Sequence, residues 1–479
     1  MNDPSTFNKS HYDELMDGLE CNEIMLSSIG EENPYFRIDA EFFQKSLLEL
    51  NIRLQKMQCI YLNKENLVSG PFGSTLKSSS FLESGDVPFV RIENIKGGFY
   101  INTDSIIYIS DFDNNRLSNS ELTIDDIVLS KVGNTIGYFA RVDEKIKKCN
   151  ISENNIGIKL RDFSKEQKHY ILTYLNCKFA QNLVIRRKSG NAQPKLNVDD
   201  MTYIPIPLFS DRLYMIVSEL INKSRNILTQ SHELYKETTL LLEDSLGFTN
   251  FEEPNEVYST KLISSSFSKS GRLDAEYYQN KYEKYATILN TADTVRSLCN
   301  LYDKNFIPNV NECYNYIELS DVGRYGDISN IGLSDGCDLP TRARRKVKSG
   351  QVIVSSIEGS LSSCALITSE YNDAICSNGF YVVDSDSINS ETLLVLFKSK
   401  PIQALLKQRC SGTILTSINK DEFLDLPLPR IKSALQEEIA VMVQKTFEFR
   451  KKAKEILNKA INIVETAIEK GEEEALKLF

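Results

Sequence analysis

The chain has 479 residues, a formal net charge of -10, and hydrophobic and charged fractions of 41% and 25%. This is the composition of an ordinary globular protein, and the length suggests several domains, since a domain usually holds about 100–200 residues. No apolar run approaches the roughly 18 residues that a membrane-spanning helix needs, so we expect no membrane insertion.

The N-terminal segment, residues 1–36, is polar and acidic, whereas a secretory signal peptide needs a basic start followed by an apolar stretch. The ten cysteines are scattered singly, with no spacing typical of a disulfide framework or a metal site. Both features predict a cytoplasmic protein without a metal centre of its own. Residues 1–36 themselves are expected to form an extension that caps the helical part or stays disordered.

A nine-residue phrase occurs twice in the chain. It reads RIDAEFFQK at residues 37–45 and RLDAEYYQN from Arg272 onward. Further pairs follow in the same order, namely DIVLSKVG at 126–133 with QVIVSSIEG at 351–359, and residues 189–208 with 411–430. In the last pair, Gly190 and Gly412 stand at the same distance before a segment in which apolar residues alternate with prolines, IPIPL in the first copy and LPLPR in the second. Collinear matches of this kind indicate an internal duplication.

Each half of the chain has the pattern of one mixed domain followed by one long helix. Short strand-like runs bounded by turn residues come first, and a helical stretch closes them, which is typical of an α+β domain. We therefore predict a first domain at residues 37–208 and a second at 249–430. The long helices that follow them are predicted at residues 209–248 and 431–475.

The two long helices carry heptad spacing. Apolar residues recur at alternating steps of four and three, which favours a coiled-coil seam between the helices. In the first helix a small hydroxyl residue mostly stands between the large ones, and we expect these small residues to face large residues of the second helix. Packing of each helix on its own domain is the alternative. The predicted seam consists of Leu213, Leu220, Ile227, Leu234, Leu241, Leu435, Ile439, Met442, Phe449, Ile456 and Ile463.

Catalytic motifs are missing from the sequence. The phrase SGPFGSTLKSSSF, at residues 69–81, fails the phosphate-loop pattern because its glycines are too close together and Lys77 stands too far from the second. The fragment NPYF, at residues 33–36, resembles part of an amino-methyltransferase pocket, but no glycine-rich cofactor turn accompanies it. The three histidines are isolated, and His232, on the first long helix, is expected to face solvent. We predict no catalytic residue and no metal ligand.

Basic residues gather in clusters despite the acidic net charge. RRKSGNAQPK ends at Lys195, KQRC precedes the equivalent Ser-Gly turn, and TRARRKVK begins at Thr341. A solvated charged loop is the plain alternative for any one cluster, but basic residues beside a repeated Ser-Gly turn favour contact with phosphates or bases. The candidate DNA-binding residues are Lys131, Arg186, Arg187, Lys188, Asn191, Gln193, Lys195, Arg342, Arg344, Arg345, Lys407 and Arg409.

Several motifs taken together resemble the specificity subunit of type I restriction-modification systems. These are SGPFGSTLKSSSF, VPFVRIENIKGG, SGNAQPKLNVDD with its proline exit, and the long helix after it, with the whole plan then repeated. The resemblance covers nearly the whole chain. It implies two pseudo-repeated target-recognition domains, each reading one half of a split DNA sequence, joined by two long helices that pair antiparallel.

The resemblance also implies partners. A subunit of this kind is not catalytic; it guides two modification subunits, which methylate adenine with S-adenosylmethionine, and restriction subunits, which are motor-nucleases that use ATP and magnesium. No cofactor is expected in this chain itself. Because KGGFYINTDSIIYISDF in the first domain has no close match in RYGDISNIGLSDGCDLP in the second, the two halves of the double-stranded DNA target are predicted to differ.

Two other functions fit parts of the sequence. A stand-alone DNA methyltransferase or nuclease would act without partners, and a coiled-coil scaffold would bind only protein through its two domains. Methyl transfer or DNA cleavage by the purified chain alone would favour the first. Sequence-specific DNA retention that survives removal of the basic clusters would favour the second.

Overall fold

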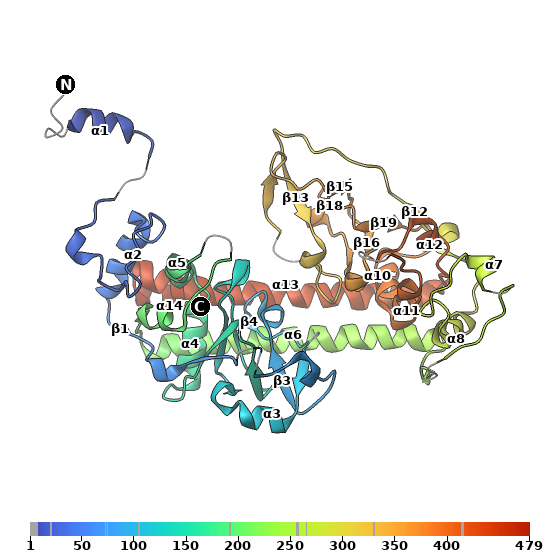
Figure 1. The fold of residues 1–479 in the computed structure, drawn as a ribbon, viewed down its shortest axis with the longest axis horizontal. Coiled ribbons are helices and arrows are strands. Elements are labelled where there is room, and N and C mark those ends of the chain that lie inside the picture. The colour runs from blue at the N-terminus through green and yellow to red at the C-terminus, as the bar shows by residue number, and fades with distance from the viewer. Residues whose placement is uncertain are drawn as a thin grey trace. The chain divides into compact units, whose positions relative to one another are not determined.

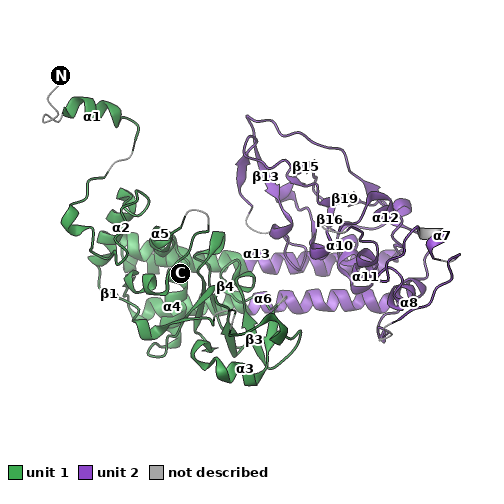
Figure 2. Ribbon diagram, viewed as in Figure 1, with its two compact units in different colours: residues 1–225, 453–479 green, residues 226–452 purple. Residues whose placement is uncertain are grey.

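The computed structural model describes residues 8–19, 22–71, 73, 75–103, 106–190, 193–254, 258–264, 266–328, 331–412 and 416–479. The chain divides into two compact units, residues 1–225 with 453–479 and residues 226–452, which Figure 2 colours green and purple. Each unit contains one mixed α/β head and one part of each long helix. Within the described ranges, no helix is both long and apolar enough to span a membrane.

Two sheets form the first head (Figure 1). Their strands are β2 (Leu67–Ser69), β3 (Val87–Val90), β4 (Phe99–Tyr100), β5 (Ile107–Ile109), β6 (Leu122–Thr123), β7 (Ile127–Ser130), β8 (Phe139–Arg141), β9 (Lys148–Ile151) and β10 (Asn155–Ile158). One sheet has the order β2-β10-β7-β8-β4 and the other β5-β3-β9-β6. A separate pair of β1 (Cys59–Ile60) and β11 (Ile206–Pro207) joins the start of the head to its end.

The second head repeats this topology. Its strands are β12 (Asn300–Leu301), β13 (Cys313–Ile317), β14 (Leu333–Asp335), β15 (Ala343–Lys346), β16 (Val352–Ser355), β17 (Cys364–Leu366), β18 (Ile375–Ser377) and β19 (Phe380–Asp384). They are ordered β12-β19-β16-β17 and β14-β13-β18-β15. The pairings keep their directions, including the parallel pairs β3 with β9 and β13 with β18. The duplicated sequence therefore folds twice into the same strand order, to which the first head adds β4.

The matching runs DIVLSKVG and QVIVSSIEG form equivalent strands. They contain β7 and β16, and each of these strands has a neighbour on both sides within its sheet. All four residues of each strand are buried. A continuous apolar run without polar alternation is typical of a strand that is covered on both faces.

Each head closes with a pair of helices. These are α4 (Lys165–Leu175) with α5 (Lys178–Arg187) in the first head and α10 (Ser390–Lys398) with α11 (Lys400–Gln408) in the second. Ser164 and Asn389 begin α4 and α10, because their side chains accept a hydrogen bond from a backbone N–H of the first turn. The remaining short helices are α1 (Lys9–Leu15), α2 (Lys45–Gln55), α3 (Asp111–Arg116), α7 (Phe267–Ser270), α8 (Asn280–Leu289), α9 (Val295–Leu298), α12 (Lys420–Leu424) and α14 (Glu472–Leu476).

The two long helices are α6 (Asp211–Ser245) and α13 (Ser433–Lys470). In unit 1 they pair antiparallel. The hydroxyl of Ser224 donates to the carbonyl of Ala453 at 3.0 Å, while the N–H of Ser210, just before α6, donates to the carboxylate of Glu472, just after α13. The predicted pairing of the long helices is therefore confirmed in this unit.

Small residues meet along the same seam in unit 2. The hydroxyl of Ser231 donates to the carbonyl of Thr446 at 3.1 Å, and both residues are fully buried. The serine hydroxyls thus bind the main-chain carbonyls of Ala453 in unit 1 and Thr446 in unit 2, and the expectation that these serines face large side chains stays a prediction. A hydroxyl reaches a main-chain carbonyl of another helix only where the two backbones approach closely.

The large residues of the predicted seam are all at least half-buried. Leu213, Leu220, Ile439 and Ile463 are buried. The half-buried ones are Ile227, Leu234, Leu241, Leu435, Met442, Phe449 and Ile456. The heptad spacing therefore identified the inner face of both helices.

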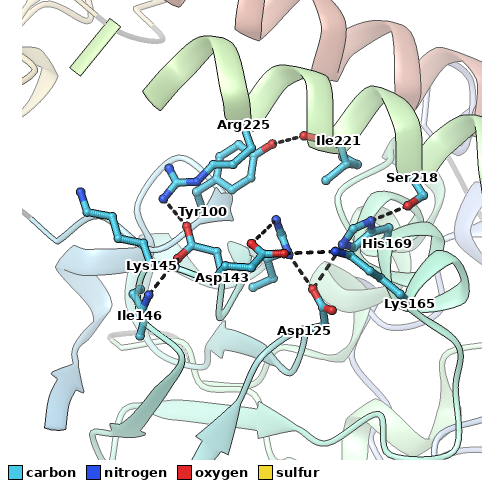
Figure 3. Close-up of polar contacts among 12 residues, drawn as sticks. Tyr100, Asp125, Asp143, Lys145, Ile146, Lys165, His169, Ser218, Ile221 and Arg225 are labelled. Atoms are coloured by element: carbon cyan, nitrogen blue, oxygen red, sulfur yellow. Dashed lines mark hydrogen bonds and ion pairs between the residues drawn. The ribbon is translucent and has the colours of Figure 1, made fainter. Parts of the chain in front are cut away.

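An arginine of α6 holds the first head (Figure 3). Arg225 pairs with Asp143, and its guanidinium carbon lies 5.1 Å from the centroid of the Tyr100 ring. The hydroxyl of Tyr100 in turn donates to the backbone carbonyl of Ile221 at 2.9 Å. An ion pair, a cation–ring contact and a hydrogen bond thus tie the head to α6 within unit 1.

An arginine of α13 does the same in unit 2. Arg450 pairs with Asp327 at 2.8 Å, and its guanidinium carbon lies 4.9 Å from the centroid of the Tyr325 ring. His232 stacks on the same ring at a centroid distance of 4.7 Å. The expectation that His232 faces solvent is therefore wrong, because the second head covers this part of α6.

A buried histidine joins α4 to α6 in unit 1 (Figure 3). The Nε2 atom of His169 is 3.2 Å from Oδ1 of Asp125, and its Nδ1 atom is 2.8 Å from the hydroxyl of Ser218. A neutral ring that donates from Nε2 and accepts at Nδ1 satisfies both contacts. Burial lowers the pKa of His169, and the nearby Arg141 lowers it further, while Asp125 acts in the opposite direction.

We expect His169 to make the stability of unit 1 depend on pH. A base whose pKa is lowered in the folded state binds its proton more readily in the unfolded chain. The free energy of unfolding therefore falls as the pH drops below the ordinary value of 6.5, with a slope of at most about 1.4 kcal/mol per pH unit for one proton. Denaturant unfolding between about pH 8 and about pH 5 should show a slope that His169→Gln flattens. His11→Gln, at an exposed histidine, is the control, and an equal slope in His169→Gln and the wild type would refute the assignment.

Candidate nucleic-acid interface

The first head carries a loop that two backbone hydrogen bonds close at its neck. Ser189 and Lys195 exchange N–H to carbonyl bonds of 2.8 and 2.7 Å. Gly190 has a φ of +96°, a conformation that residues with a side chain rarely adopt, so the turn requires glycine. The described residues of this segment, 188–190 and 193–196, are named here the first Ser-Gly loop.

The second head has the same loop in the equivalent place. Ser411 and Ser417 exchange two backbone hydrogen bonds of 3.0 Å, and Gly412 has a φ of +130°. The described residues 410–412 and 416–418 are named the second Ser-Gly loop. Two copies of one closed neck indicate that this backbone geometry has a role in both heads.

The end of a central strand lies beside each loop. After β7, the carbonyl of Lys131 accepts from the N–H of Leu196 at 2.8 Å. After β16, the carbonyl of Ser356 accepts from the N–H of Ile418, also at 2.8 Å. Each loop is therefore docked on the end of a fully buried strand of its head, which gives it a rigid base.

Two lysines of the first head come together at this base. Lys131 is half-buried and donates to the hydroxyl of Ser69 at 2.8 Å, while Lys195 is exposed at the loop neck. Burial lowers the pKa of Lys131, and Lys195 lowers it further, whereas Glu153 raises it. A phosphate close to both ammonium groups would relieve their mutual repulsion. These lysines are therefore the strongest phosphate-binding candidates of the first head.

Two arginines predicted to bind DNA are buried instead. Arg186 and Arg187, the last residues of α5, are 5% and 3% exposed. Nε of Arg186 donates to the carbonyl of Phe42 at 2.8 Å, and Nη1 of Arg187 donates to the carbonyl of Glu32 at 3.1 Å. Burial lowers the pKa of Arg187 to about 10, which still leaves it charged at neutral pH. Both guanidinium groups are bound by protein and closed to solvent, so we revise their predicted role from DNA contact to support of the loop.

In the second head, too, an arginine that was predicted to bind DNA is mostly buried. The side chain of Arg409 is only 13% exposed, and its Nη1 donates to the carbonyl of Leu405 at 3.2 Å. Burial lowers its pKa as it does for Arg187. Lys407, in the last turn of α11, is exposed and stays a candidate for DNA contact.

The other predicted residues of the first loop lie in different surroundings. Gln193 is exposed, and Lys188 is half-buried with its carbonyl accepting from Arg37. Asn191 lies outside the described residues. Gln193 thus joins Lys131 and Lys195 as a side chain with access to a ligand at this loop.

The basic run of the second head lies along β15. Arg342 pairs with Glu318 at 2.7 Å, and Arg345 donates to the side chain of Asn305 at 3.1 Å. Arg344 belongs to no ion pair among the described residues. Arg345 is therefore engaged with protein, whereas Arg344 and the exposed Arg342 can meet a phosphate.

Arg342 lies on the same side of the head as the second Ser-Gly loop. Its carbonyl accepts from the N–H of Asn378 at 2.8 Å, and the next residue, Gly379, accepts from the N–H of Ser356 at 2.9 Å. Ser356 in turn holds the loop through Ile418. Backbone hydrogen bonds thus connect Arg342, the residue before β15, to the second Ser-Gly loop through Gly379 and Ser356.

Equivalent positions of the two heads carry different side chains. The residue directly after the central strand is Lys131 in the first head and Ser356 in the second. The second residue of the loop neck is Lys195 in the first head and Ser417 in the second. The two heads therefore share one backbone arrangement but present different side chains to a ligand.

Sequence reasoning missed the arginines of the repeated phrase, Arg37 and Arg272, which contact the two loops directly. The signal that pointed to them was the repetition itself. Among the described residues, no group of three or more His, Cys, Asp and Glu side chains is placed to hold a metal ion.

Comparison with known proteins identifies the first head. The family model of the type I restriction modification DNA specificity domain matches residues 72–210. No curated protein sequence matches the chain. The type I restriction-modification system S subunit from M. genitalium is 13% identical, with 88% of this chain and 96% of that chain covered and a TM-score of 0.36. The HsdS subunit from Thermoanaerobacter tengcongensis is 15% identical, with 85% and 95% covered and a TM-score of 0.25.

The matched domain contains the central strand, the lysines and the loop of the first head, and the second head repeats its strand order. Residues 72–210, and with them most of the first head, are therefore similar to the type I restriction modification DNA specificity domain.

Proposed function

We propose that each head reads one half of a bipartite DNA target and that the two halves differ in sequence. The observation that carries this proposal is the duplication, since two heads of one topology present unlike side chains beside equivalent loops. Symmetric dimers suit palindromic targets. A single chain with two related but non-identical readers suits a target whose two parts are separated and unequal.

In the first head, Lys131 and Lys195 contact phosphates and Gln193 reads a base edge, because an amide has both a donor and an acceptor to offer. Asn191 is a further candidate for base reading. In the second head, positive charge comes from Arg342, Arg344 and Lys407, of which Lys407 accepts a backbone hydrogen bond from the loop residue Cys410.

The paired helices α6 and α13 act as a spacer between the readers and as the surface that holds two modification subunits. Seam contacts in both units and a duplicated plan support this assignment. We assign the target-recognition domains to residues 37–208 and 249–430, the spacer helices to residues 209–248 and 431–475, and an extension to residues 1–36. Adenine methylation with S-adenosylmethionine, and ATP- and magnesium-dependent restriction, belong to the partner subunits.

Mapping of methylated adenines across the host genome, with and without this gene, tests the proposal. The expected result is one split motif with two unlike halves, whose methylation disappears on deletion and returns on re-expression. A continuous or palindromic motif, or a deletion that leaves every modified adenine in place, would contradict it. Methyl transfer by the purified chain alone would favour a stand-alone enzyme instead.

A further inference from the structure

The repeated phrase contacts the first Ser-Gly loop. Arg37 binds the carboxylate of Asp39 through two hydrogen bonds, from Nε at 2.8 Å and from Nη2 at 2.7 Å. Its Nη1 donates to the carbonyl of Lys188 at 2.7 Å and to that of Arg186 at 3.2 Å. The side chain of Arg37 is only 13% exposed. One guanidinium therefore joins the phrase to the residue immediately before the loop neck.

The second copy of the phrase makes the same contacts. Arg272 binds the carboxylate of Asp274 at 2.8 and 2.7 Å, and its Nη2 donates to the carbonyl of Cys410 at 2.8 Å. Cys410 immediately precedes the neck residue Ser411, so the contact falls on the position equivalent to Lys188. The arrangement thus occurs independently in each unit.

A contact in the opposite direction is repeated as well. Nε of Arg186 donates to the carbonyl of Phe42 at 2.8 Å, and Nε2 of Gln408 donates to the carbonyl of Tyr277 at 2.9 Å. The arginine of each phrase also lies over the ring of this aromatic residue, 4.9 and 4.3 Å from its centroid. In both heads, the repeated phrase and the C-terminal end of the helix before the loop therefore donate hydrogen bonds to each other.

The chemistry of a helix end explains these contacts. The last carbonyls of a helix have no partner within the helix, and a positive charge there is favoured by the helix dipole. Arg37 satisfies the carbonyl of Arg186 in the last turn of α5, and Arg272 binds the carbonyl of Cys410, two residues after the end of α11. The hydrogen bond from Arg37 also holds the pKa of Asp39 below its ordinary value. The paired carboxylate keeps the planar guanidinium in one orientation, which fixes the helix end and the loop neck together.

We propose that Arg37 with Asp39, and Arg272 with Asp274, are positioning residues for DNA reading, each pair fixing the neck of its own Ser-Gly loop. This inference rests on the proposed function of the two heads. The arginines bind protein rather than DNA, but they determine where the base-reading side chains of the loop stand. Loss of one pair therefore costs sequence discrimination in one half of the target and spares the other half. The phrase occurs twice because each loop needs its own pair.

The test uses the full chain in complex with its modification subunit and duplexes that carry one changed base pair in one half of the mapped target. Arg37→Ala should lose about tenfold or more of the discrimination in one half only, and Arg272→Ala should lose it in the other half. The salt dependence of binding should stay as in the wild type, because neither arginine contacts a phosphate. A general loss of folded protein would instead weaken the discrimination of both halves.

Two further variants make the result decisive. Arg37→Lys keeps the charge but lacks the planar fork, so its discrimination should fall between those of the wild type and Arg37→Ala, and it provides the measurement if the alanine variant does not fold. Arg116→Ala removes an arginine that pairs with Asp113 on α3 of the same head and should keep the discrimination of both halves.

The possible failures can be told apart. A wild-type complex that discriminates neither half overturns the proposed function, and the positioning role with it. If the wild type discriminates both halves, then folded Arg37 variants that still discriminate both, or that lose both equally, overturn the positioning role alone.

Discussion

Replacement of Lys131 and Lys195 by alanine should weaken DNA binding by about tenfold or more and should lower the slope of log affinity against log salt by about two. Lys195 belongs to the first Ser-Gly loop and the carbonyl of Lys131 holds that loop, and each phosphate contact releases about one counterion. The ratio of affinities for target and non-target duplexes should change little, because phosphates carry no sequence information. Titration of labelled duplexes at several salt concentrations, with the chain bound to its modification subunit, measures all three quantities.

The matched control removes the same charge elsewhere in unit 1. Lys56, at the end of α2, and Lys145, after β8, are both exposed, and their double replacement by alanine should leave the salt slope nearly unchanged. Equal losses in the two double variants would show that net charge alone decides binding. In that case Lys131 and Lys195 would hold no particular phosphate.

The duplicated fold was predictable because it depends on patterns that survive any tertiary context. The apolar runs of β7 and β16 lack polar alternation, so they had to be covered on both faces. The heptad spacing of α6 and α13 likewise determines which helix face can be buried, whatever covers it. Pairing of these faces follows from their shared register.

The burial of Arg187 and Arg409 was predictable in principle, but the charge of these residues suggested a surface position. Arg187 stands four residues after Leu183, on the buried face of α5. Arg409 stands four residues after Leu405, on the buried face of α11. Helical periodicity therefore places both arginines on an apolar face, and carbonyls of the surrounding chain compensate their burial.

The contacts that hold the loops and heads could not be predicted from sequence. A spacing of two residues in the phrase allows Arg37 to bind Asp39, but the carbonyl that Arg37 also binds lies 151 residues further along the chain. Arg225 and Arg450 anchor the two heads to different helices and follow no repeated motif. Packing between distant segments decides such partners.

Ser231→Leu should destabilise unit 2 by about 1–3 kcal/mol, and Ser224→Leu should do the same to unit 1. Both serines are buried between α6 and α13, where each hydroxyl donates to a main-chain carbonyl of the facing helix. Leucine adds bulk where each serine hydroxyl reaches a carbonyl of the facing helix, so the helices must separate or the side chain must leave its preferred rotamer. Serine to alanine removes only the hydroxyl and should cost about 1 kcal/mol. Denaturant unfolding of the full chain measures both effects.

Lys223→Leu is the matched control, because Lys223 is exposed beside Ser224 on the same helix and the added apolar bulk stays outside the seam. It should change the free energy of unfolding by less than about 0.5 kcal/mol. Leucine tolerated as well as alanine at Ser224 and Ser231 would mean that the helices have room between them. The proposed spacer role of α6 and α13 predicts that a folded Ser231→Leu chain weakens the discrimination of both half-sites together. Arg37→Ala should weaken the discrimination of only one half-site. The two variants therefore distinguish a disturbed helix pair from a disturbed loop.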